Sequence, residues 1–459
     1  MKASLSFIAG VTGGSLRGPD LDIAGIGIDT RTLAAGEVFV AIRGERLDGH
    51  DYVAAAVERG AAAVVVARPV EVRVPQVIVA DTTQALGDLA RAWRARFDLR
   101  LVAVGGSNGK TTTKEMIAAI LGGIGPVLAT RGNLNNHIGV PLTLFRLDGT
   151  HRCAVIEMGA NHPGEIAALV DIARPTVGII TNAGAEHLEG FGSLDGVAAA
   201  EGEMVAGLGP AATAVINAGD DYAGLWRGMS RAGRIVSFGA AAADFRAEDV
   251  RSGIEAGAFV TDFRLVTPAG SRPVRLALAG AHNVVNALGA AAAAAAAGAP
   301  LEVIVAGLGS MRAVKGRLQL KSTPQGAWLI DDSYNANPSS VRAGIDTLAA
   351  LPGRRLLVLG EMAELGDHAR ASHEDAATYA RARGVERLFA LGEGARDAVR
   401  AFGAGAAWYG SAGELTVALR PELSAGTYVL VKGSRVNRLE RVVEALAAGN
   451  AIAEAGGTH

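Results

Sequence analysis

The chain has 459 residues, of which 49% are hydrophobic and 20% are charged, so an intrinsically disordered protein is excluded and about three domains are expected. Its 44 basic and 46 acidic residues nearly balance, giving a formal charge of −2 without a run of basic residues. A nucleic-acid partner held by a positive face is therefore not expected.

The single cysteine, Cys153, excludes an intramolecular disulfide and is typical of a reducing compartment. It lies in an apolar run, which favours a buried core residue over a nucleophile. No signal peptide is visible, and the alanine run at 290–297 is too short to cross a membrane. We therefore expect a cytoplasmic protein without membrane insertion.

The first expected domain, residues 1–98, has the pattern of a small α/β unit. Its predicted strands are 38–42, 63–66 and 76–79, and its predicted helices are 52–59 and 83–97. Two polar segments that contain or follow strand ends, 29–31 and 43–51, are placed where a ligand could be held. From these residues alone, ordinary solvated turns are the favoured interpretation.

A glycine-rich turn joins the apolar strand 101–104 to a predicted amphipathic helix. The turn consists of Gly105, Gly106, Ser107, Asn108, Gly109, Lys110, Thr111 and Thr112. Such a turn directs backbone N–H groups and the positive end of the helix dipole at one point, which suits a phosphate. Lys110 would add positive charge there, and the Thr111 hydroxyl would bind Mg²⁺. Val104 stands where a complete Walker A sequence has glycine, so the turn is the shorter Gly-x-x-Gly-Lys-Thr form.

The second expected domain, residues 99–312, alternates strands with helices, which predicts a parallel sheet covered on both faces. Its predicted strands are 101–104, 153–157, 177–181, 213–217 and 234–238. Glu157 ends one of these strands, and His187 lies in the segment after another, at the edge where such sheets bind ligands. Together they could hold Mg²⁺, although a lone histidine is more often a surface residue.

Residues 240–280 have the pattern of an irregular antiparallel extension, followed by the alanine-rich helix. Asn283 stands near the start of that helix, so helix capping alone could account for it.

The third expected domain, residues 313–459, restarts the alternation and predicts a Rossmann-like unit. Its predicted strands are 327–331, 355–359, 387–391 and 427–431, and its predicted helices are 339–351, 373–383, 395–402, 412–419 and 437–448. Lys432, Ser434 and Arg435 form a second strand–glycine–helix turn, which could receive a carboxylate. Charged residues at a helix start without any ligand are an equally good interpretation.

These residues predict an ATP-using enzyme with three α/β domains that transfers a phosphoryl group to an acid or activates it. A regulatory nucleotide-binding switch is the alternative from another class. The extra domains, with polar loops at their strand ends, favour an enzyme that holds further substrates.

Five segments resemble the ATP-dependent Mur ligases of peptidoglycan synthesis, in family order and over nearly the whole chain. They are 106–112, 157–159, 182–192, 282–286 and 331–338. The segments 132–141 and 331–338 are most similar to the member that adds D-alanyl-D-alanine. The Asp-Asn-Pro-Arg signature of the member that adds the third peptide residue is absent.

The resemblance implies a small N-terminal α/β domain that binds UDP, a central P-loop ATPase domain with a parallel sheet, and a Rossmann-like C-terminal domain that binds the incoming dipeptide. It implies ATP and Mg²⁺ as cofactors, and UDP-N-acetylmuramoyl-tripeptide and D-alanyl-D-alanine as substrates. ATP would convert the terminal carboxylate of the tripeptide to an acyl phosphate, which the dipeptide amine attacks. The family also implies a monomer.

The same resemblance assigns roles to individual residues. Nucleotide binding would involve residues 105–112 together with Asn283, Arg317, Asp332 and Asn335. Thr111 and Glu157 would bind the metal near ATP, and His187 a second metal near the carboxylate. Arg317 lies at the junction of the second and third domains, so it would reach ATP only when the domains close.

The substrates would contact a further set of residues. Those expected for UDP are Thr30, Arg31, Asp48 and His50; those for the peptide are Asn135 and Asn136; and those for the dipeptide are Lys432, Ser434 and Arg435.

Glu201 marks a departure from the family pattern. Family members commonly carry a carbamylated lysine there, in an Ala-Lys-Gly-Glu setting, which supports the second metal; here Glu201 stands between Ala200 and Gly202. Our hypothesis is that Glu201 supplies the negative charge directly, without CO₂. The alternative is an exposed helix glutamate in a chain that has lost this feature. The catalytic residues that we expect are Lys110, His187, Glu201 and Arg317.

Overall fold

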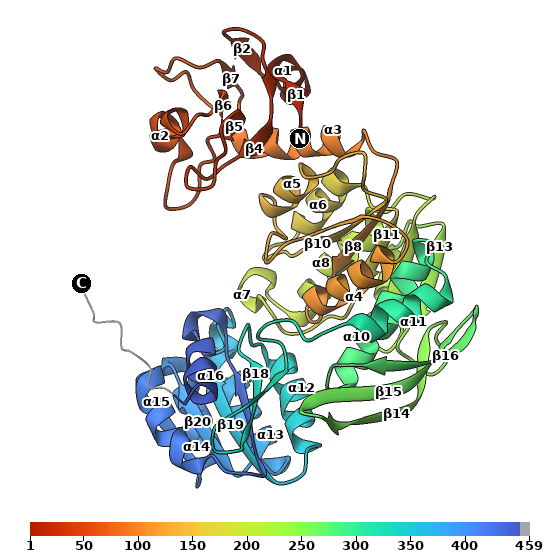
Figure 1. Ribbon diagram of the computed structural model, residues 1–459, viewed down its shortest axis with the longest axis vertical. Helices are drawn as coiled ribbons and strands as arrows, with labels where there is room; N and C mark the ends of the chain where they lie inside the picture. The colour runs from red at the N-terminus through yellow and green to blue at the C-terminus, as the bar shows by residue number, and fades with distance from the viewer. Residues whose placement is uncertain (450–459) are drawn as a thin grey trace.

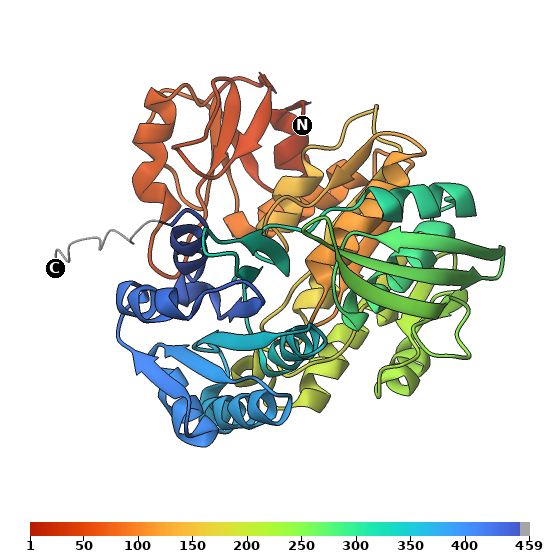
Figure 2. The ribbon, with the colours of Figure 1, turned by 60° about the horizontal axis from the view of Figure 1, so that its bottom comes forward.

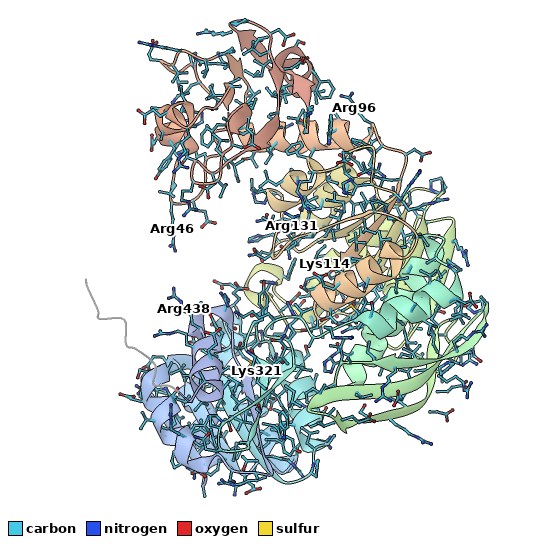
Figure 3. All side chains as sticks on the ribbon, viewed as in Figure 1. Arg46, Arg96, Lys114, Arg131, Lys321 and Arg438 are labelled. Carbon is cyan, nitrogen blue, oxygen red and sulfur yellow. The ribbon has the colours of Figure 1, made fainter. Side chains whose placement is uncertain are left out.

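The structure, a computed structural model, describes residues 1–449. It contains three successive α/β units, each built around its own large sheet (Figure 1). The N-terminal and C-terminal units both flank the central one. Arg46 of the first unit and Arg438 of the third point into the same space between them (Figure 3).

The N-terminal unit is built on a five-stranded sheet with the order β2-β7-β6-β5-β4, in which the β2–β7 pair is antiparallel. Its elements are β1 (Ala3–Ser4), α1 (Leu5–Thr12), β2 (Ser15–Arg17), β3 (Asp22–Ile23), β4 (Gly25–Gly27), β5 (Glu37–Val40), α2 (Val53–Glu58), β6 (Ala63–Val66), β7 (Gln76–Ile78) and α3 (Thr82–Arg94). All three predicted strands and both predicted helices are present. The strands β1 to β4 were not anticipated, because runs of two or three half-exposed residues have no clear periodicity.

Helix α3 attaches this unit to the central one. The guanidinium of Arg94, at its last turn, is buried and donates hydrogen bonds to the carbonyls of Ala173, Phe97 and Leu99. The indole of Trp93 donates to the carbonyl of Leu147. These bonds satisfy polar groups at the junction and fix the first unit to the second.

The central sheet is parallel throughout, with the order β13-β12-β11-β8-β10-β9. Its strands are β8 (Arg100–Gly105), β9 (Val127–Ala129), β10 (Cys153–Glu157), β11 (Val177–Ile180), β12 (Thr213–Asn217) and β13 (Arg234–Phe238). Strand β8 lies between β11 and β10, so the segments that follow these two strands flank the glycine-rich turn. The expected parallel sheet is therefore confirmed.

Alternate residues of β8 face opposite sides of the sheet. Val102 and Val104 pack into one apolar core with helices α4, α10 and α11, whereas Leu101 and Ala103 pack into another with α6 and α8. The helices of this unit are α4 (Lys110–Gly122), α5 (Gly139–Leu144), α6 (Glu165–Ala173), α7 (Leu188–Phe191), α8 (Leu194–Ala206), α9 (Ala223–Met229), α10 (Ala281–Ala296) and α11 (Leu301–Ser310). Both faces of the sheet are thus buried, which explains its apolar strands.

The alanine run lies inside α10, where residues 290–294 are fully buried. Within residues 1–449, no helix has both the length and the apolarity needed to cross a membrane.

The expected antiparallel extension is present as a three-stranded sheet of β14 (Arg246–Glu255), β15 (Ala258–Thr267) and β16 (Gly270–Leu276). In Figure 2 it is the green sheet on the right of the molecule, and β16 packs against α11.

The C-terminal unit has a six-stranded sheet with the order β17-β18-β22-β19-β20-β21, in which only the β17–β18 pair is antiparallel. Its strands are β17 (Gln319–Ser322), β18 (Trp328–Asp332), β19 (Arg354–Gly360), β20 (Arg387–Leu391), β21 (Ala406–Tyr409) and β22 (Thr427–Lys432), and its helices are α12 (Pro338–Ala349), α13 (Ala369–Ala382), α14 (Arg396–Phe402), α15 (Ala412–Leu419) and α16 (Glu440–Ala447). Short 3₁₀ helices lie at Gly49–Tyr52, Gly366–His368, Glu393–Ala395, Arg420–Glu422 and Arg435–Asn437. The four predicted strands form the middle of this sheet, and the two edge strands were not anticipated.

Gly307 of α11 lies against the backbone of α4, where a Cβ would come within 2.5 Å of the Cα of Ile120. We predict that Gly307→Ala lowers the free energy of unfolding by about 1–3 kcal/mol, because the two helices must separate. The midpoint of urea unfolding, followed by circular dichroism, measures this change.

Gly309 in the same helix is the matched control. It is exposed, and a Cβ there would lie 3.8 Å from its nearest neighbour, the carbonyl oxygen of Arg275. Gly309→Ala should stabilise the protein by about 0.5–1 kcal/mol through backbone entropy alone. Equal effects of the two substitutions would contradict our account of the α4–α11 contact.

Candidate active site

The glycine-rich turn between β8 and α4 packs tightly against the end of β11. Gly106 has a φ of +109°, and a Cβ there would lie 2.1 Å from the Thr181 hydroxyl oxygen. Gly109 has a φ of +80° and is the N-cap of α4. Only glycine combines this backbone conformation with so little space, so the turn depends on both residues.

Three amides of the turn bind other parts of the protein. The N–H of Ser107 donates to the carbonyl oxygen of Asn182 at 2.9 Å, and that of Asn108 to the Asn182 side-chain oxygen at 2.9 Å. The N–H of Gly106 donates to Glu201 Oε2 at 2.6 Å. The amides of the first turn of α4 have no intrahelical acceptor, so they are the groups available to a phosphate.

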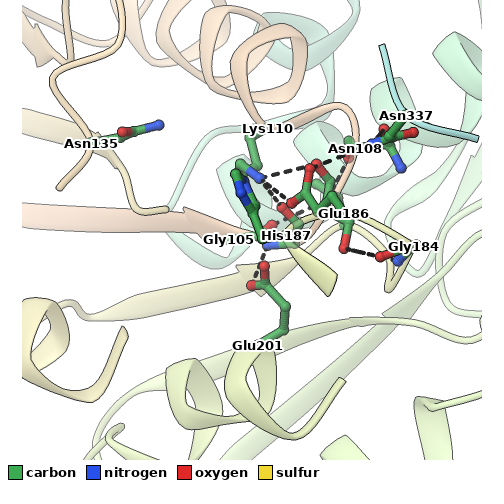
Figure 4. A network of polar contacts seen from close by, with 12 residues as sticks. Gly105, Asn108, Lys110, Asn135, Gly184, Glu186, His187, Glu201 and Asn337 are labelled. Carbon is green, nitrogen blue, oxygen red and sulfur yellow. Dashed lines mark hydrogen bonds and ion pairs between the residues drawn. The ribbon is translucent and has the colours of Figure 1, made fainter. Parts of the chain in front are cut away.

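The Lys110 ammonium lies over the turn (Figure 4). Its Nζ donates to the carbonyls of Gly106 at 2.5 Å and Ser107 at 3.0 Å, and forms an ion pair with Glu186 Oε1 at 2.9 Å. Burial lowers the pKa of Lys110, but the surrounding carboxylates, Glu186 foremost, outweigh it and leave the pKa raised. Lys110 is therefore a permanent positive charge at the predicted phosphate site.

Glu157 fits the predicted magnesium site. Its side chain is buried, with Oε1 accepting a hydrogen bond from Asn135 Nδ2 at 2.9 Å. Its Oε2 is also buried but has no hydrogen-bond partner in residues 1–449. A buried carboxylate oxygen without a donor is costly, and a cation would satisfy it.

No group of three or more His, Cys, Asp or Glu side chains in the described chain could hold a metal by itself. Mg²⁺ usually takes one or two protein ligands and completes its shell with phosphate oxygens and water. Thr111, at the start of α4, and Glu157 are the residues that would hold it.

Glu201 is buried beneath the turn, with 6% of its surface exposed, so the alternative of an exposed helix glutamate is wrong. Burial, partly offset by the charge of Lys110, raises the pKa of its carboxyl group to about 7. The hypothesis that Glu201 supplies charge near a second metal stays a prediction. The hydrogen bond to Gly106 gives it a structural contact that the sequence did not suggest.

His187 has a φ of +50° and pairs through Nδ1 with Glu364 Oε2 of the C-terminal unit at 2.5 Å. Glu364 is also in the left-handed region, with a φ of +63°. The predicted metal role of His187 is untested, and Glu364 was not anticipated as its neighbour.

The C-terminal unit reaches the turn through Arg317. Its Nη2 donates to the Thr111 hydroxyl oxygen at 3.2 Å, and its guanidinium lies 4.5 Å from the centre of the Tyr334 ring. Arg317 thus stands beside the phosphate loop, as predicted for a closed arrangement of these two units.

A second contact between these units joins Asn108 to the start of α12. Asn337 Nδ2 donates to Asn108 Oδ1 at 2.9 Å, and Asn108 Nδ2 donates to the Ser339 hydroxyl at 2.9 Å. Both the amide oxygen and the amide nitrogen of the Asn108 side chain are therefore bonded to the C-terminal unit.

Lys432 and Ser434 both form bonds within their own unit, and their predicted contact with the dipeptide stays a prediction. Lys432 is buried, and its Nζ pairs with Asp332 Oδ2 at 2.6 Å and donates to the carbonyl of Asn335 at 3.0 Å. The Ser434 hydroxyl donates to the carbonyl of Ala336. These side chains join the ends of neighbouring strands β18 and β22, a pairing that local sequence does not reveal.

Arg435 is exposed and also pairs within its own unit, through Nη1 with Glu440 Oε1 at 3.2 Å; with Arg438 and Arg441 it lines a cavity of 710 Å³. The predicted contact of Arg435 with the dipeptide carboxylate stays a prediction.

Asn283 is not a helix cap, because the N-cap of α10 is Gly280. The Asn283 side chain is buried, donating to the carbonyl of Ala279 and accepting from Asn286.

Two predicted ligand residues have hydrogen bonds within the protein. Both ring nitrogens of buried His50 are bonded, to Asp48 Oδ1 and to the N–H of Ala67, so neither is free for UDP. Asn136 Oδ1 accepts from the backbone N–H of Gly139 at the start of α5.

Of the remaining residues expected at UDP, Arg31 is exposed and pairs with Asp29, and Thr30 lies beside it.

Glu186 and Asn337 are the site residues that sequence reasoning missed. Glu186 follows β11 of the central sheet, and Asn337 follows β18 of the C-terminal sheet. Each lies after the carboxyl end of a strand, where ligands were expected, and this position was the available signal. Their importance depends on contacts with Lys110 and Asn108, which only the folded loops create.

Three family models match successive parts of the chain: "Mur ligase family, catalytic domain" at 22–94, "Mur ligase middle domain" at 104–294, and "Mur ligase, glutamate ligase domain" at 316–435. A UDP-N-acetylmuramoyl-tripeptide–D-alanyl-D-alanine ligase of Escherichia coli (strain K12) is 43% identical over 450 residues, covering 97% of this chain and 98% of that protein. The chain belongs to the Mur ligase family.

Further Mur ligases are also similar to this chain in sequence or in structure. A ligase of the same name from Bacillus subtilis (strain 168) is 35% identical over 97% of this chain and 98% of its own length. The crystal structure of MurF from Acinetobacter baumannii superposes with a TM-score of 0.92 at 35% identity, covering 98% of this chain and 99% of that one. MurF ligase from Thermotoga maritima in complex with ADP gives a TM-score of 0.83 at 27% identity, covering 92% and 97%.

The raised pKa of Glu201 predicts a pH dependence of stability. The folded chain holds this proton more tightly than the unfolded chain does, so Glu201 favours folding least at high pH. Between about pH 4.5 and pH 7, the free energy of unfolding of wild type should fall by on the order of 3 kcal/mol through this group. The Glu201→Gln variant should not show this fall.

Urea unfolding of both proteins at pH 5 and pH 8 measures this difference. Stability of the variant relative to wild type should rise with pH. A constant difference would show that Glu201 is ionised alike in the folded and unfolded chains.

Proposed function

We propose that this Mur ligase joins D-alanyl-D-alanine to UDP-N-acetylmuramoyl-tripeptide, with conversion of ATP to ADP and phosphate. The product would be UDP-N-acetylmuramoyl-pentapeptide, a precursor of peptidoglycan. The observation that carries the proposal is the match to ligases of this name along nearly the full length of both chains. A phosphate loop at the centre of the middle sheet supports the use of ATP.

The chemistry needs ATP because a carboxylate is a poor acceptor for an amine. Transfer of the terminal phosphoryl group to the tripeptide carboxylate gives an acyl phosphate. Attack by the dipeptide amine then forms the amide bond and releases phosphate. Bound Mg²⁺ would offset phosphate charge and fix the positions of its oxygens.

The chain's own residues would bind and orient the phosphates. Lys110 places positive charge over the phosphate loop, and the free amides at the start of α4 donate hydrogen bonds. Thr111 and Glu157 would hold the metal, and Arg317 brings a second positive charge from the C-terminal unit. His187 stays a proposed ligand of a second metal.

The substrates would lie between the units. The exposed Arg31 region of the first unit would bind UDP, Asn135 would lie along the peptide, and Arg435 would pair with the dipeptide carboxylate. We further propose domain boundaries near residues 98 and 312, a monomer, and a cytoplasmic location.

The decisive experiment measures ADP release from ATP·Mg²⁺ and UDP-N-acetylmuramoyl-tripeptide, with and without D-alanyl-D-alanine. We predict a large rise on adding the dipeptide, together with the pentapeptide product by mass spectrometry. A rise with a different amino acid or peptide only would keep the family and change the acceptor. Slow release indifferent to every acceptor would indicate a nucleotide switch.

Arg317 provides a test of the contact between units. Arg317→Lys keeps the charge but loses the planar group that reaches Thr111 and stacks on Tyr334. We predict that kcat falls about a hundredfold, the usual cost of losing one positioned donor to a developing charge.

Arg312→Lys is the control, because the Arg312 guanidinium binds only carbonyls at the end of its own helix. This variant should keep the turnover of wild type. If both variants retained full turnover, Arg317 would have no role in the reaction.

A further inference from the structure

Glu186 lies beside the phosphate loop and has no role in the proposed function. The segment after β11 brings its carboxylate to Lys110, with 2.9 Å between Oε1 and Nζ (Figure 4). The side chains of Lys110 and Glu186 are only 14% and 12% exposed. An ion pair so shielded from water is stronger than one on the surface.

Lys110 lies among several carboxylates, and Glu186 interacts with it most strongly. Glu186, Glu201 and Glu157 all act on the Lys110 ammonium, and Glu186 has the largest influence of the three. The ammonium also donates to two carbonyls of the loop. Any phosphate entering the loop therefore meets a lysine whose charge is already engaged, and a carboxylate of its own sign beside it.

We propose that Glu186 competes with the nucleotide phosphates for Lys110 and thereby sets the affinity of the phosphate loop. The inference rests on the proposed function, because it requires nucleotide to bind at this loop. Binding exchanges one partner of the ammonium for another, since the Lys110–Glu186 pair opens as the lysine moves to the phosphate.

The C-terminal unit holds the carboxylate from its other side. Glu186 Oε2 lies 3.5 Å from Asn337 Nδ2, and Asn337 also donates to Asn108 of the phosphate loop. When Lys110 leaves, Asn337 is the donor that remains to Glu186. Glu186 is thus a positioning residue, acting on the nucleotide through Lys110 and in contact with the unit that supplies Arg317.

The test measures nucleotide affinity directly, by isothermal titration calorimetry of the full chain with ADP·Mg²⁺ and, separately, ATP·Mg²⁺. Glu186→Gln removes the charge and keeps the size. We expect about five- to tenfold tighter binding of both nucleotides, because a shielded competitor and a like charge are removed.

The matched control is Glu189→Gln. Glu189 lies three residues further along the chain and is exposed, and it forms no bond with Lys110 in the described structure. This variant loses the same charge from the same segment, so its affinity should equal that of wild type. Tighter binding by both variants would indicate general electrostatics and overturn the specific role of Glu186.

A second substitution, Glu186→Ala, protects the test against a local defect in the glutamine variant. Thermal unfolding identifies any variant that has lost its fold, and both neutral variants should bind nucleotide more tightly than wild type. Unchanged or weaker binding by folded variants overturns the proposal, and weaker binding would instead make Glu186 a ligand of the metal. Failure of wild type to bind either nucleotide would overturn the proposed function itself.

Discussion

The close packing of the phosphate loop against the end of β11 is the constraint on which the rest of the site depends. Gly106 lies against Thr181, and the amides of Ser107 and Asn108 donate to Asn182, so the loop is held beside the segment that carries Glu186 and His187. Strand β10 on the other side delivers Glu157 to the same edge. A parallel sheet thus brings three separate segments to one point, and the glycine allows them to approach within hydrogen-bond distance.

This convergence leaves an excess of negative charge around one lysine. Lys110 interacts with three carboxylates, and burial of one of them, Glu201, raises the pKa of that group. In residues 1–449 the buried Oε2 of Glu157 has no hydrogen-bond partner, so the protein groups do not satisfy one another. Magnesium and Arg317 would supply the missing positive charge, so the site is built to be completed by its ligands and by the C-terminal unit.

The sequence was sufficient for the parts of the fold that follow from periodicity. Strands such as 153–157 and 213–217 were predicted to the residue, because their central residues are apolar and buried on both faces. Short edge strands carry no such pattern. The partners of the motif residues did not follow from the sequence: Lys432 pairs with Asp332, 100 positions away, and Glu186 meets Lys110 only through the fold of its loop. Side-chain pairing needs the tertiary structure.

The bonds of Asn108 also have a consequence for the order in which the protein is made. Its partners, the N-cap Asn337 and Ser339 at the start of α12, lie 229 and 231 positions later in the chain. A ribosome adding 5–20 residues per second needs roughly ten to fifty seconds to synthesise that interval. The middle sheet can form during this time, since its own strands are complete by residue 238. Its phosphate loop nevertheless waits for the last unit, so a chain released early would carry the motif without its final polar contacts.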